Sequence, residues 1–341
     1  FGHRTGGLGH TTIGSAMAFG SVSGSAAATV AAIGKLMYPD LRKIGYSDKF
    51  SLGLIVSSAE TAILIPPSIT MIIYGWMTGT SITALFAGGL AVGMVLGLAF
   101  AALVVFESKR NNVGSAPALA KGEFVLRFKE ARWALGMPVI ILGGIYSGFF
   151  TATEAAAVSV IYALLVESII YKNLNWSRFF QLIERGAVSS TVIFILLAMG
   201  SVLSYFVTVI QLPDLLTNFL VSIDAGTVTF LLAVNIAFFI AGMFIDPNSA
   251  LLILVPPLFP VATALGIDPI HFGLVVTLNI GIGMITPPFG LDIFVAASTL
   301  QKPVMTIING VWPFLFVNIL VLMLITYVPG ISTFLPNLLA K

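Results

Sequence analysis

The chain has 341 residues, of which 58% are hydrophobic and 9% are charged, and its mean hydropathy is +1.04. Soluble domains carry roughly a quarter of charged residues, so this composition excludes a water-soluble globular fold. The absence of cysteine excludes disulfides, thiolate metal sites and a cysteine nucleophile. The net charge of +2 gives no indication of a nucleic-acid partner, and we expect none.

Apolar runs of about 20 residues recur along the whole chain, and each is long enough to cross the roughly 30 Å of hydrocarbon in a bilayer. A transmembrane β-barrel would need alternating apolar and polar residues. Runs such as ITALFAGGLAVGMVLGLAFAALVVF do not alternate. The sequence therefore predicts an all-α polytopic membrane protein.

Lysine and arginine indicate the direction of the crossings. They concentrate in residues 35–49, 107–132 and 172–185, which the positive-inside rule places in the cytoplasm. Residues 107–132 are expected to form an amphipathic cytoplasmic arm or a simple linker. This orientation predicts full crossings at about 50–77, 82–106, 134–149, 155–171, 187–209, 272–299 and 308–327.

Two further apolar segments do not fit this scheme as ordinary crossings. Residues 10–37 are interrupted by polar residues at 21–25, and their ends carry basic residues, so both ends should lie in the cytoplasm. Residues 226–263 are interrupted at 246–249, and their ends lack basic residues, so both ends should lie outside. We predict two re-entrant helical hairpins, although hydropathy alone also permits two full crossings in each.

Glycine and Pro-Pro positions in the first half of the chain recur in the second half at one constant offset. Gly45 and Gly266 lie 221 residues apart, and so do the Pro-Pro pairs that begin at Pro66 and Pro287. Each copy contains, in order, a hairpin, an apolar run and a Pro-Pro break. Because the first copy begins inside and the second outside, we predict inverted repeats, a recurring plan of secondary transporters.

The predicted breaks supply chemistry that an unbroken helix lacks. Backbone groups freed inside a membrane are tolerated where they line a polar cavity. Their carbonyls and nearby hydroxyls can hold a small hard cation. Their helix N-termini carry partial positive charge that suits a carboxylate.

Five stretches carry a family resemblance: GSVSGSAAATVAAIG, LIPPSITMIIYG, GFFTATEAAAVSVIYAL, FIDPNSALLILVPPLFPVATALGIDPIHFGLV and GIGMITPPFGLDIFVAAS. They resemble the large membrane subunit of a TRAP (tripartite ATP-independent periplasmic) transporter. The resemblance implies a multi-pass protein of the bacterial inner membrane that imports an organic acid with sodium ions. It also implies two partners, a small membrane subunit and a periplasmic substrate-binding protein.

The resemblance further implies a division of labour along the chain. Residues 1–80 and 211–300 are expected to form the two repeats of a transport domain that moves in an elevator fashion. Residues 81–210, with the arm at 107–132, and residues 301–341 are expected to form scaffold and connecting helices. About three membrane segments normally precede this region in the family, so we expect the N-terminal part of the scaffold to be missing from this chain.

Two sodium sites are expected, each at a hairpin tip and the helix break that accompanies it. The residues expected to bind sodium are Ser23, Gly24, Ser25, Pro66 and Ser68 in the first copy and Asp246, Asn248, Ser249, Thr286 and Pro287 in the second. The residues expected to contact the substrate carboxylate are Ser25, Thr29, Glu60, Ser68 and Asp292. We expect no catalytic residue and no metal other than sodium.

Two other classes of protein compete with the transporter interpretation. A membrane-embedded enzyme could use Asp246 and Asp292 as a pair, but neither residue lies in a recognisable catalytic motif. A channel could use the same helix breaks without alternating access. Saturable uptake that requires sodium and a binding protein would separate a transporter from a channel.

Overall fold

The computed structural model describes residues 6–114, 122–222 and 226–339, and these ranges are almost entirely helical and contain no strand. This confirms the predicted all-α class. Among the described residues, six helical segments are long and apolar enough to cross a membrane. They are Ile82–Arg110, Ala152–Ile170, Trp176–Val209, Thr227–Phe244, Pro247–Ala264 and Val304–Tyr327.

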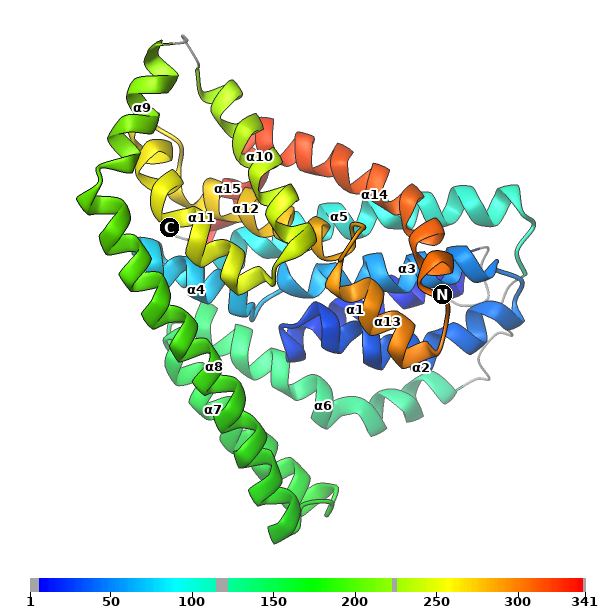
Figure 1. Ribbon diagram of the computed structural model, residues 1–341. Coiled ribbons are helices and arrows are strands. Elements are labelled where there is room, and N and C mark those ends of the chain that lie inside the picture. The colour runs from blue at the N-terminus through cyan, green and yellow to red at the C-terminus, as the bar shows by residue number, and fades with distance from the viewer. Residues whose placement is uncertain (1–5, 115–121, 223–225, 340–341) are drawn as a thin grey trace. The chain divides into compact units, whose positions relative to one another are not determined.

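Contacts within the chain define two compact units. Unit 1 comprises Phe1–Ala118 and Val207–Lys341, and unit 2 comprises Leu119–Phe206. Unit 1 contains both predicted hairpins and both Pro-Pro breaks, together with helices α5 (Ile82–Arg110) and α14 (Val304–Tyr327) (Figure 1). These units do not follow the expected boundaries at residues 80, 210 and 300, and the division into transport domain and scaffold stays a prediction.

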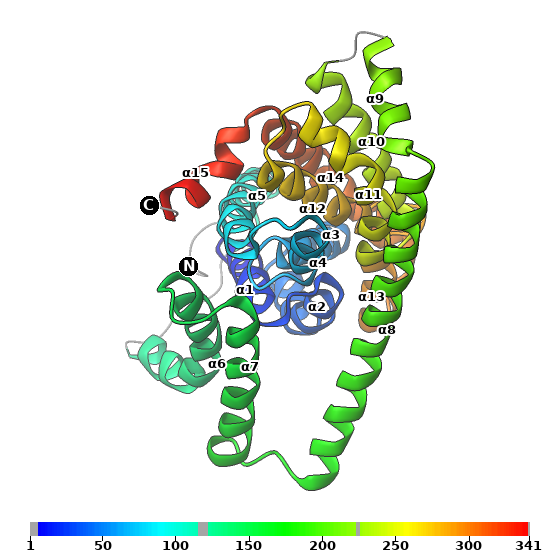
Figure 2. The same ribbon diagram turned by 90° about the vertical axis from the view of Figure 1, so that its left-hand side faces the viewer.

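Unit 2 consists of a helical pair and most of a long third helix. Helices α6 (Glu123–Tyr146) and α7 (Ala152–Leu165) lie side by side, and the Tyr162 hydroxyl donates a 2.7 Å hydrogen bond to the Trp133 carbonyl (Figure 2). A π-helical turn, η2 (Val166–Ile170), extends α7, and α8 (Trp176–Val209) follows.

Both ends of the expected arm at residues 107–132 are helical. Its first residues complete α5, which ends at Arg110, and residues 123–132 are the first turns of α6. No glycine or proline interrupts the chain between Glu123 and Leu135, so that helix continues directly into the crossing expected at 134–149. Residues 115–121, in the middle of the expected arm, lie outside the described ranges, and the arm stays a prediction.

The hairpin predicted at 10–37 is present in unit 1. Helix α1 (Gly7–Ser23) ends at Gly24, and α2 (Ala26–Lys43) begins after Ser25, whose hydroxyl accepts a hydrogen bond from the Ala28 amide. Gly24 is left-handed with φ +59°, a conformation that glycine adopts without steric cost, and its amide donates to the Gly20 carbonyl at 2.8 Å.

The hairpin predicted at 226–263 is also present. Helix α10 (Thr227–Phe244) is followed by extended Ile245, and Asp246 caps α11 (Pro247–Ala264). The Asp246 carboxylate accepts hydrogen bonds from the Asn248 and Ser249 amides at 3.1 and 3.2 Å. Both α10 and α11 are long enough to span a membrane, so the re-entrant character of this hairpin stays a prediction.

The Pro-Pro pairs at Pro66 and Pro287 each lie in a break between two helices, whereas a third pair, Pro256-Pro257, lies inside α11. Helix α3 (Asp48–Glu60) passes through a 3-10 turn, η1 (Thr61–Ile63), and α4 (Ile69–Thr78) begins after Ser68. Helix α12 (Pro269–Met284) ends before the second pair, and α13 (Leu291–Leu300) follows it. Proline has no amide to donate and therefore weakens a helix at its position. The Pro66-Pro67 and Pro287-Pro288 peptide bonds are cis.

Glycine packs each hairpin against the broken helix of its own copy. A Cβ atom on Gly20 would lie 2.7 Å from the Ala62 Cα, and one on Gly242 would lie 2.9 Å from the Gly283 Cα. Each glycine lies four residues before its tip, at Gly24 or Asp246. This close backbone contact brings each tip to the break of the same copy.

Two short helices were not predicted from the sequence. They are α9 (Leu212–Ser222) and α15 (Pro329–Leu339), each of 11 residues. Hydropathy identifies segments long enough to span the bilayer, so helices of this length give no signal.

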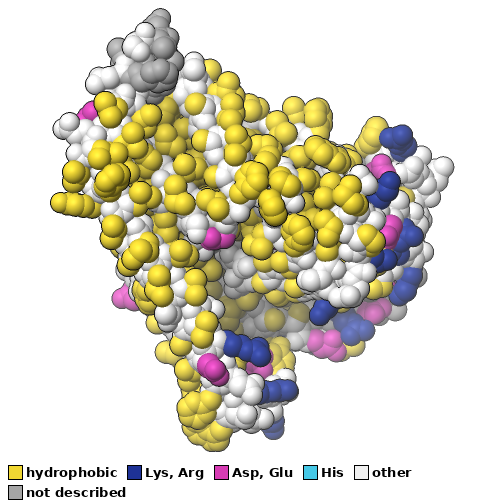
Figure 3. Space-filling view, in the orientation of Figure 1, with side chains coloured by type: hydrophobic (Ala, Val, Ile, Leu, Met, Phe, Trp, Pro, Cys, Tyr) yellow, Lys and Arg dark blue, Asp and Glu magenta, His cyan; other side chains and the backbone are white. Residues whose placement is uncertain are grey.

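The basic residues of unit 1 collect at one of its ends, on the right in Figure 3, whereas much of the remaining visible surface is apolar. The Tyr46 hydroxyl lies 2.6 Å from the Ser108 hydroxyl, so the turn after α2 adjoins the C-terminal end of α5. This arrangement agrees with the expectation that residues 35–49 and the beginning of 107–132 share one side of the membrane.

Candidate functional site

A cavity of about 200 Å³ lies in unit 1 where the two hairpin tips meet. The tips of the hairpins α1–α2 and α10–α11 both line it. Its lining residues come from both copies: Gly24, Ser25, Ala26, Ala27, Ile63, Ile69, Thr70, Asp246, Pro247, Asn248, Met284 and Leu291. No Lys or Arg stands among these described lining residues.

Four helices begin at this cavity. The first residues of α2 and α4 line it from the first copy, and those of α11 and α13 line it from the second. The first amides of a helix lack partners within the helix, and the N-terminus carries about half a positive charge. Four such ends around one space favour an anionic group without a basic side chain.

The residues expected to form the first sodium site lie close together. A Cβ atom on Gly24 would lie 2.6 Å from the Pro67 carbonyl oxygen, so the first tip contacts the first break directly. The Ser25 side chain lines the cavity, and the buried Ser68 hydroxyl caps α4. Pro66, which precedes Pro67 in the sequence, is buried. Ser23, the residue before Gly24, is half-buried.

The residues expected to form the second sodium site are assembled in part. The Ser249 hydroxyl donates to the Asp246 carboxylate, and Asp246 and Asn248 line the cavity. The Phe244 and Phe289 rings lie 5.7 Å apart, so the second tip adjoins the second break, where Pro287 lies. The Thr286 hydroxyl is buried and donates to the Ile282 carbonyl at 2.6 Å, within its own helix.

The residues expected to contact substrate lie in different places. Ser25 lines the cavity, and Ser68 lies at the start of α4 next to lining residue Ile69. Thr29 is buried and its hydroxyl donates to the Ser25 carbonyl at 2.8 Å. Glu60 and Asp292 are buried and are absent from the described lining.

Two residues were missed by the sequence analysis. Thr70, in the first turn of α4, lines the cavity, and its signal was its place just after the capping Ser68. Asn318 is fully buried within α14, and its amide donates a 3.0 Å hydrogen bond to the Glu60 carboxylate. A lone asparagine in the apolar run at 308–327 was a detectable signal.

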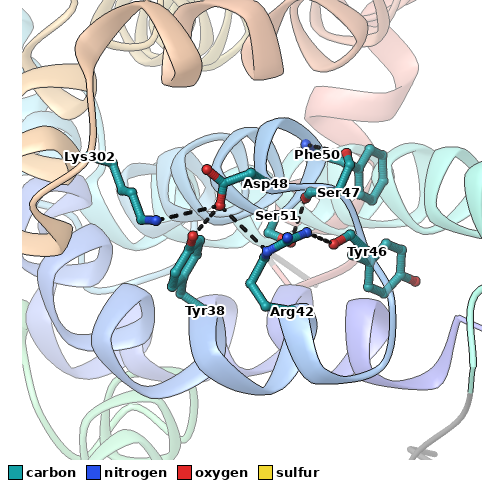
Figure 4. A network of polar contacts seen from close by, with 8 residues as sticks. All are labelled: Tyr38, Arg42, Tyr46, Ser47, Asp48, Phe50, Ser51 and Lys302. Atoms are coloured by element: carbon teal, nitrogen blue, oxygen red, sulfur yellow. Dashed lines mark hydrogen bonds and ion pairs between the residues drawn. The ribbon is translucent and has the colours of Figure 1, made fainter.

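A second polar cluster lies at the basic end of unit 1 (Figure 4). Asp48, in the first turn of α3, accepts a hydrogen bond from the Tyr38 hydroxyl. Its Oδ1 atom lies 3.5 Å from Arg42 Nε and 3.8 Å from Lys302 Nζ. The neighbouring Tyr38 hydroxyl and Asp48 carboxylate raise the pKa of Lys302 above its usual value. The cluster joins α2, α3 and the link between α13 and α14.

Replacing Asp48 with asparagine should lower the thermal stability of the protein modestly, by up to about 1 kcal/mol, because its ion pairs are half-exposed. The loss should shrink in high salt, which screens such pairs. Thermal unfolding followed by size-exclusion chromatography measures both effects. Asp40→Asn is the control, since Asp40 pairs only with Lys43 of its own helix at 2.8 Å. An equal or smaller effect of Asp48→Asn would contradict a role in joining the helices.

Comparison with known proteins identifies relatives over nearly the whole chain. Residues 1–331 match the family described as "Tripartite ATP-independent periplasmic transporter, DctM component". The ectoine TRAP transporter large permease protein of Halomonas elongata is 41% identical over 337 residues, covering 99% of this chain and 79% of the relative. The C4-dicarboxylate TRAP transporter large permease protein of Pseudomonas aeruginosa is 37% identical over 337 residues, covering 98% and 79%. The sialic acid TRAP transporter large permease protein of Vibrio cholerae is 38% identical over 338 residues, covering 99% and 79%.

These matches confirm the family resemblance noted in the sequence. The relatives are transporter permeases, which are not enzymes. With the candidate membrane spans of the described residues, the matches also confirm a multi-pass protein of the inner membrane.

Proposed function

Because the chain belongs to the DctM component family of TRAP transporters, we propose that it imports a carboxylate-bearing solute together with sodium ions. The observation that carries this proposal is the cavity at the two hairpin tips, where four helices begin. In this proposal the chain alternates between inward and outward access by an elevator movement of the two repeats.

The cavity suits a carboxylate. The helix N-termini of α2, α4, α11 and α13 present partial positive charge, and Ser25 and Thr70 line the cavity beside them. The first amides of α11, at Asn248 and Ser249, are occupied by the Asp246 carboxylate. Its volume of about 200 Å³ limits the group held there to a small one. The rest of a larger solute would extend beyond this space.

Two other features of the cavity, the helix C-termini and the Asp246 carboxylate, suit a sodium ion. Helices α1 and α12 end near the cavity, and carbonyl oxygens at helix C-termini attract cations. The Asp246 carboxylate adds a full negative charge. Hard cations prefer such oxygen ligands. A sodium ion beside the helix starts would add positive charge for the substrate carboxylate, which couples the two binding events.

We propose a small membrane subunit and a periplasmic substrate-binding protein as partners. Unit 2 offers surface for contact within the membrane, because α7, η2 and α8 expose many large apolar side chains, including Val160, Ile169, Phe194 and Tyr205. Such surfaces need lipid or another helix to cover them.

Uptake into proteoliposomes tests this function. The chain would be reconstituted with its small subunit and binding protein, and radiolabelled ectoine, a C4-dicarboxylate and sialic acid would be offered in turn, since these solutes appear in the names of the relatives. We expect saturable uptake of one carboxylate that requires an inward sodium gradient and the binding protein. Uptake that persists without a sodium gradient would contradict sodium coupling, and uptake that does not saturate would favour a channel.

A further inference from the structure

Glu60 and Asp292 are acidic residues whose side chains are almost completely buried. They are the only buried acidic residues in the described part of the chain, with 1% and 0% of their surface exposed, and no Lys or Arg is buried there. Glu60 ends α3, and Asp292 lies in the first turn of α13. Helices α3 and α13 pack against each other, and both pack against α14. Two like charges therefore share one buried region of unit 1.

Their oxygens lack hydrogen-bond partners. Eight buried side-chain polar atoms of the described chain have none, and four of the eight are Glu60 Oε1, Asp292 Oδ1, Asp292 Oδ2 and Asn318 Oδ1. Asn318 belongs to the same cluster, because its Nδ2 atom donates to Glu60 Oε2 at 3.0 Å. The buried Ser57 hydroxyl, one helical turn before Glu60, is also unpartnered.

None of the ion pairs found among the described residues involves Glu60 or Asp292. Along α13, Asp292 lies ten residues before Lys302, or about 15 Å at the rise of an α-helix. Along α3, Glu60 lies twelve residues after Asp48, where the Arg42 and Lys302 contacts are. An uncompensated buried carboxylate is strongly unfavourable, and a second one beside it is more so.

A bound cation would both supply a partner for the unpartnered oxygens and compensate the charge of the two buried carboxylates. All four unpartnered atoms of Glu60, Asp292 and Asn318 can act as acceptors, so the missing group must be positive or a donor. Carboxylate, amide and hydroxyl oxygens form the ligand set that hard cations prefer. The three residues come from α3, α13 and α14, which pack against one another.

We propose that Glu60, Asp292 and Asn318 hold a sodium ion inside unit 1, at a site separate from the hairpin tips. The existence of the site rests on the unpartnered buried oxygens. The choice of sodium rests on the proposed function. An ion there ties the second half of one broken helix, α13, to the first half of the other, α3, through α14.

Sodium binding can be measured without transport. The transporter complex would be purified in choline buffer, and bound radioactive sodium would be counted per complex during titration, for the unaltered chain and for Glu60→Gln, Asp292→Asn and Asp40→Asn. We expect the first two substitutions to remove one bound sodium ion per chain. The exposed control Asp40→Asn should bind the full number.

Thermal stability measured with and without sodium provides a second test. If Glu60 and Asp292 had a structural role only, their replacement would not change the stabilisation by sodium. Without sodium, Glu60→Gln and Asp292→Asn should unfold at the same or a higher temperature than the unaltered chain, because they remove a buried like charge. With sodium, the stabilisation of the unaltered chain should be reduced by at least half in both variants.

Three results would overturn the proposal. The first is an unchanged sodium count in both folded variants. The second is an equal loss of stability with and without sodium, which indicates a structural role only. The third is stabilisation that follows pH or calcium and not sodium. Failure of the hairpin-tip sites would be distinguished by Asp246→Asn, which should remove a different ion from the count.

Discussion

Replacing Asp246 with asparagine should raise the sodium concentration that half-saturates uptake by about tenfold or more, a loss of about 1.4 kcal/mol or more in sodium binding. Asparagine caps a helix about as well as aspartate, so α11 keeps its first turn. The substitution removes the negative charge that Asp246 contributes to the cavity and one of its two acceptor oxygens, the one that accepts from the Ser249 hydroxyl. Sodium-dependent uptake into proteoliposomes measures the change.

The chain contains a matched control for this substitution. Asp268 caps α12 in the same way, followed by proline and accepting hydrogen bonds from the Ile270 and His271 amides at 2.8 and 3.0 Å. Asp268 is not among the residues that line the cavity. We expect Asp268→Asn to leave the sodium dependence unchanged. Equal behaviour of the two variants would show that the Asp246 charge has no part in sodium coupling.

Replacing Gly53 with alanine should destabilise the folded protein by about 3 kcal/mol, the upper end of the usual cost of overpacking. A Cβ atom at Gly53 would lie 2.0 Å from the Gly310 carbonyl oxygen, and one at Gly310 would lie 2.0 Å from the Lys49 carbonyl oxygen. Both obstacles are backbone atoms, which cannot rotate away as a side chain can. The backbones of α3 and α14 therefore touch at this point, and the added methyl group must separate them.

The control for this prediction is Gly14→Ala in α1. Nothing lies within 4 Å of a Cβ atom at Gly14, and alanine is the better helix former, so we expect equal or slightly higher stability. Thermal unfolding in detergent, monitored by the amount of monodisperse protein, compares the two variants. If Gly53→Ala matched Gly14→Ala, close contact between α3 and α14 would not be required for the fold.

Much of the local structure could be predicted because its causes are local. Serine and glycine at 21–25, the Asp-Pro pair at Asp246 and the Pro-Pro pairs at Pro66 and Pro287 each interrupt an apolar run. A missing amide or a side-chain cap favours the end of a helix through contacts within one turn, although α11 continues through Pro256 and Pro257. The hairpins and breaks were therefore found where the sequence predicted them, whereas the short helices α9 and α15 were not.

For the candidate site too, some features could be predicted from the sequence and others could not. The sequence determined that this is a helical membrane protein with two copies of an interrupted unit, because hydropathy and breaking residues act over one or two turns. Only the tertiary structure decided which polar residues face the cavity. Ser25 lines it, whereas Glu60 and Asp292 are buried elsewhere, and Glu60 accepts a hydrogen bond from Asn318, 258 residues away in sequence. The direction of a side chain from a fully packed helix depends on the helices around it, and no local pattern encodes that.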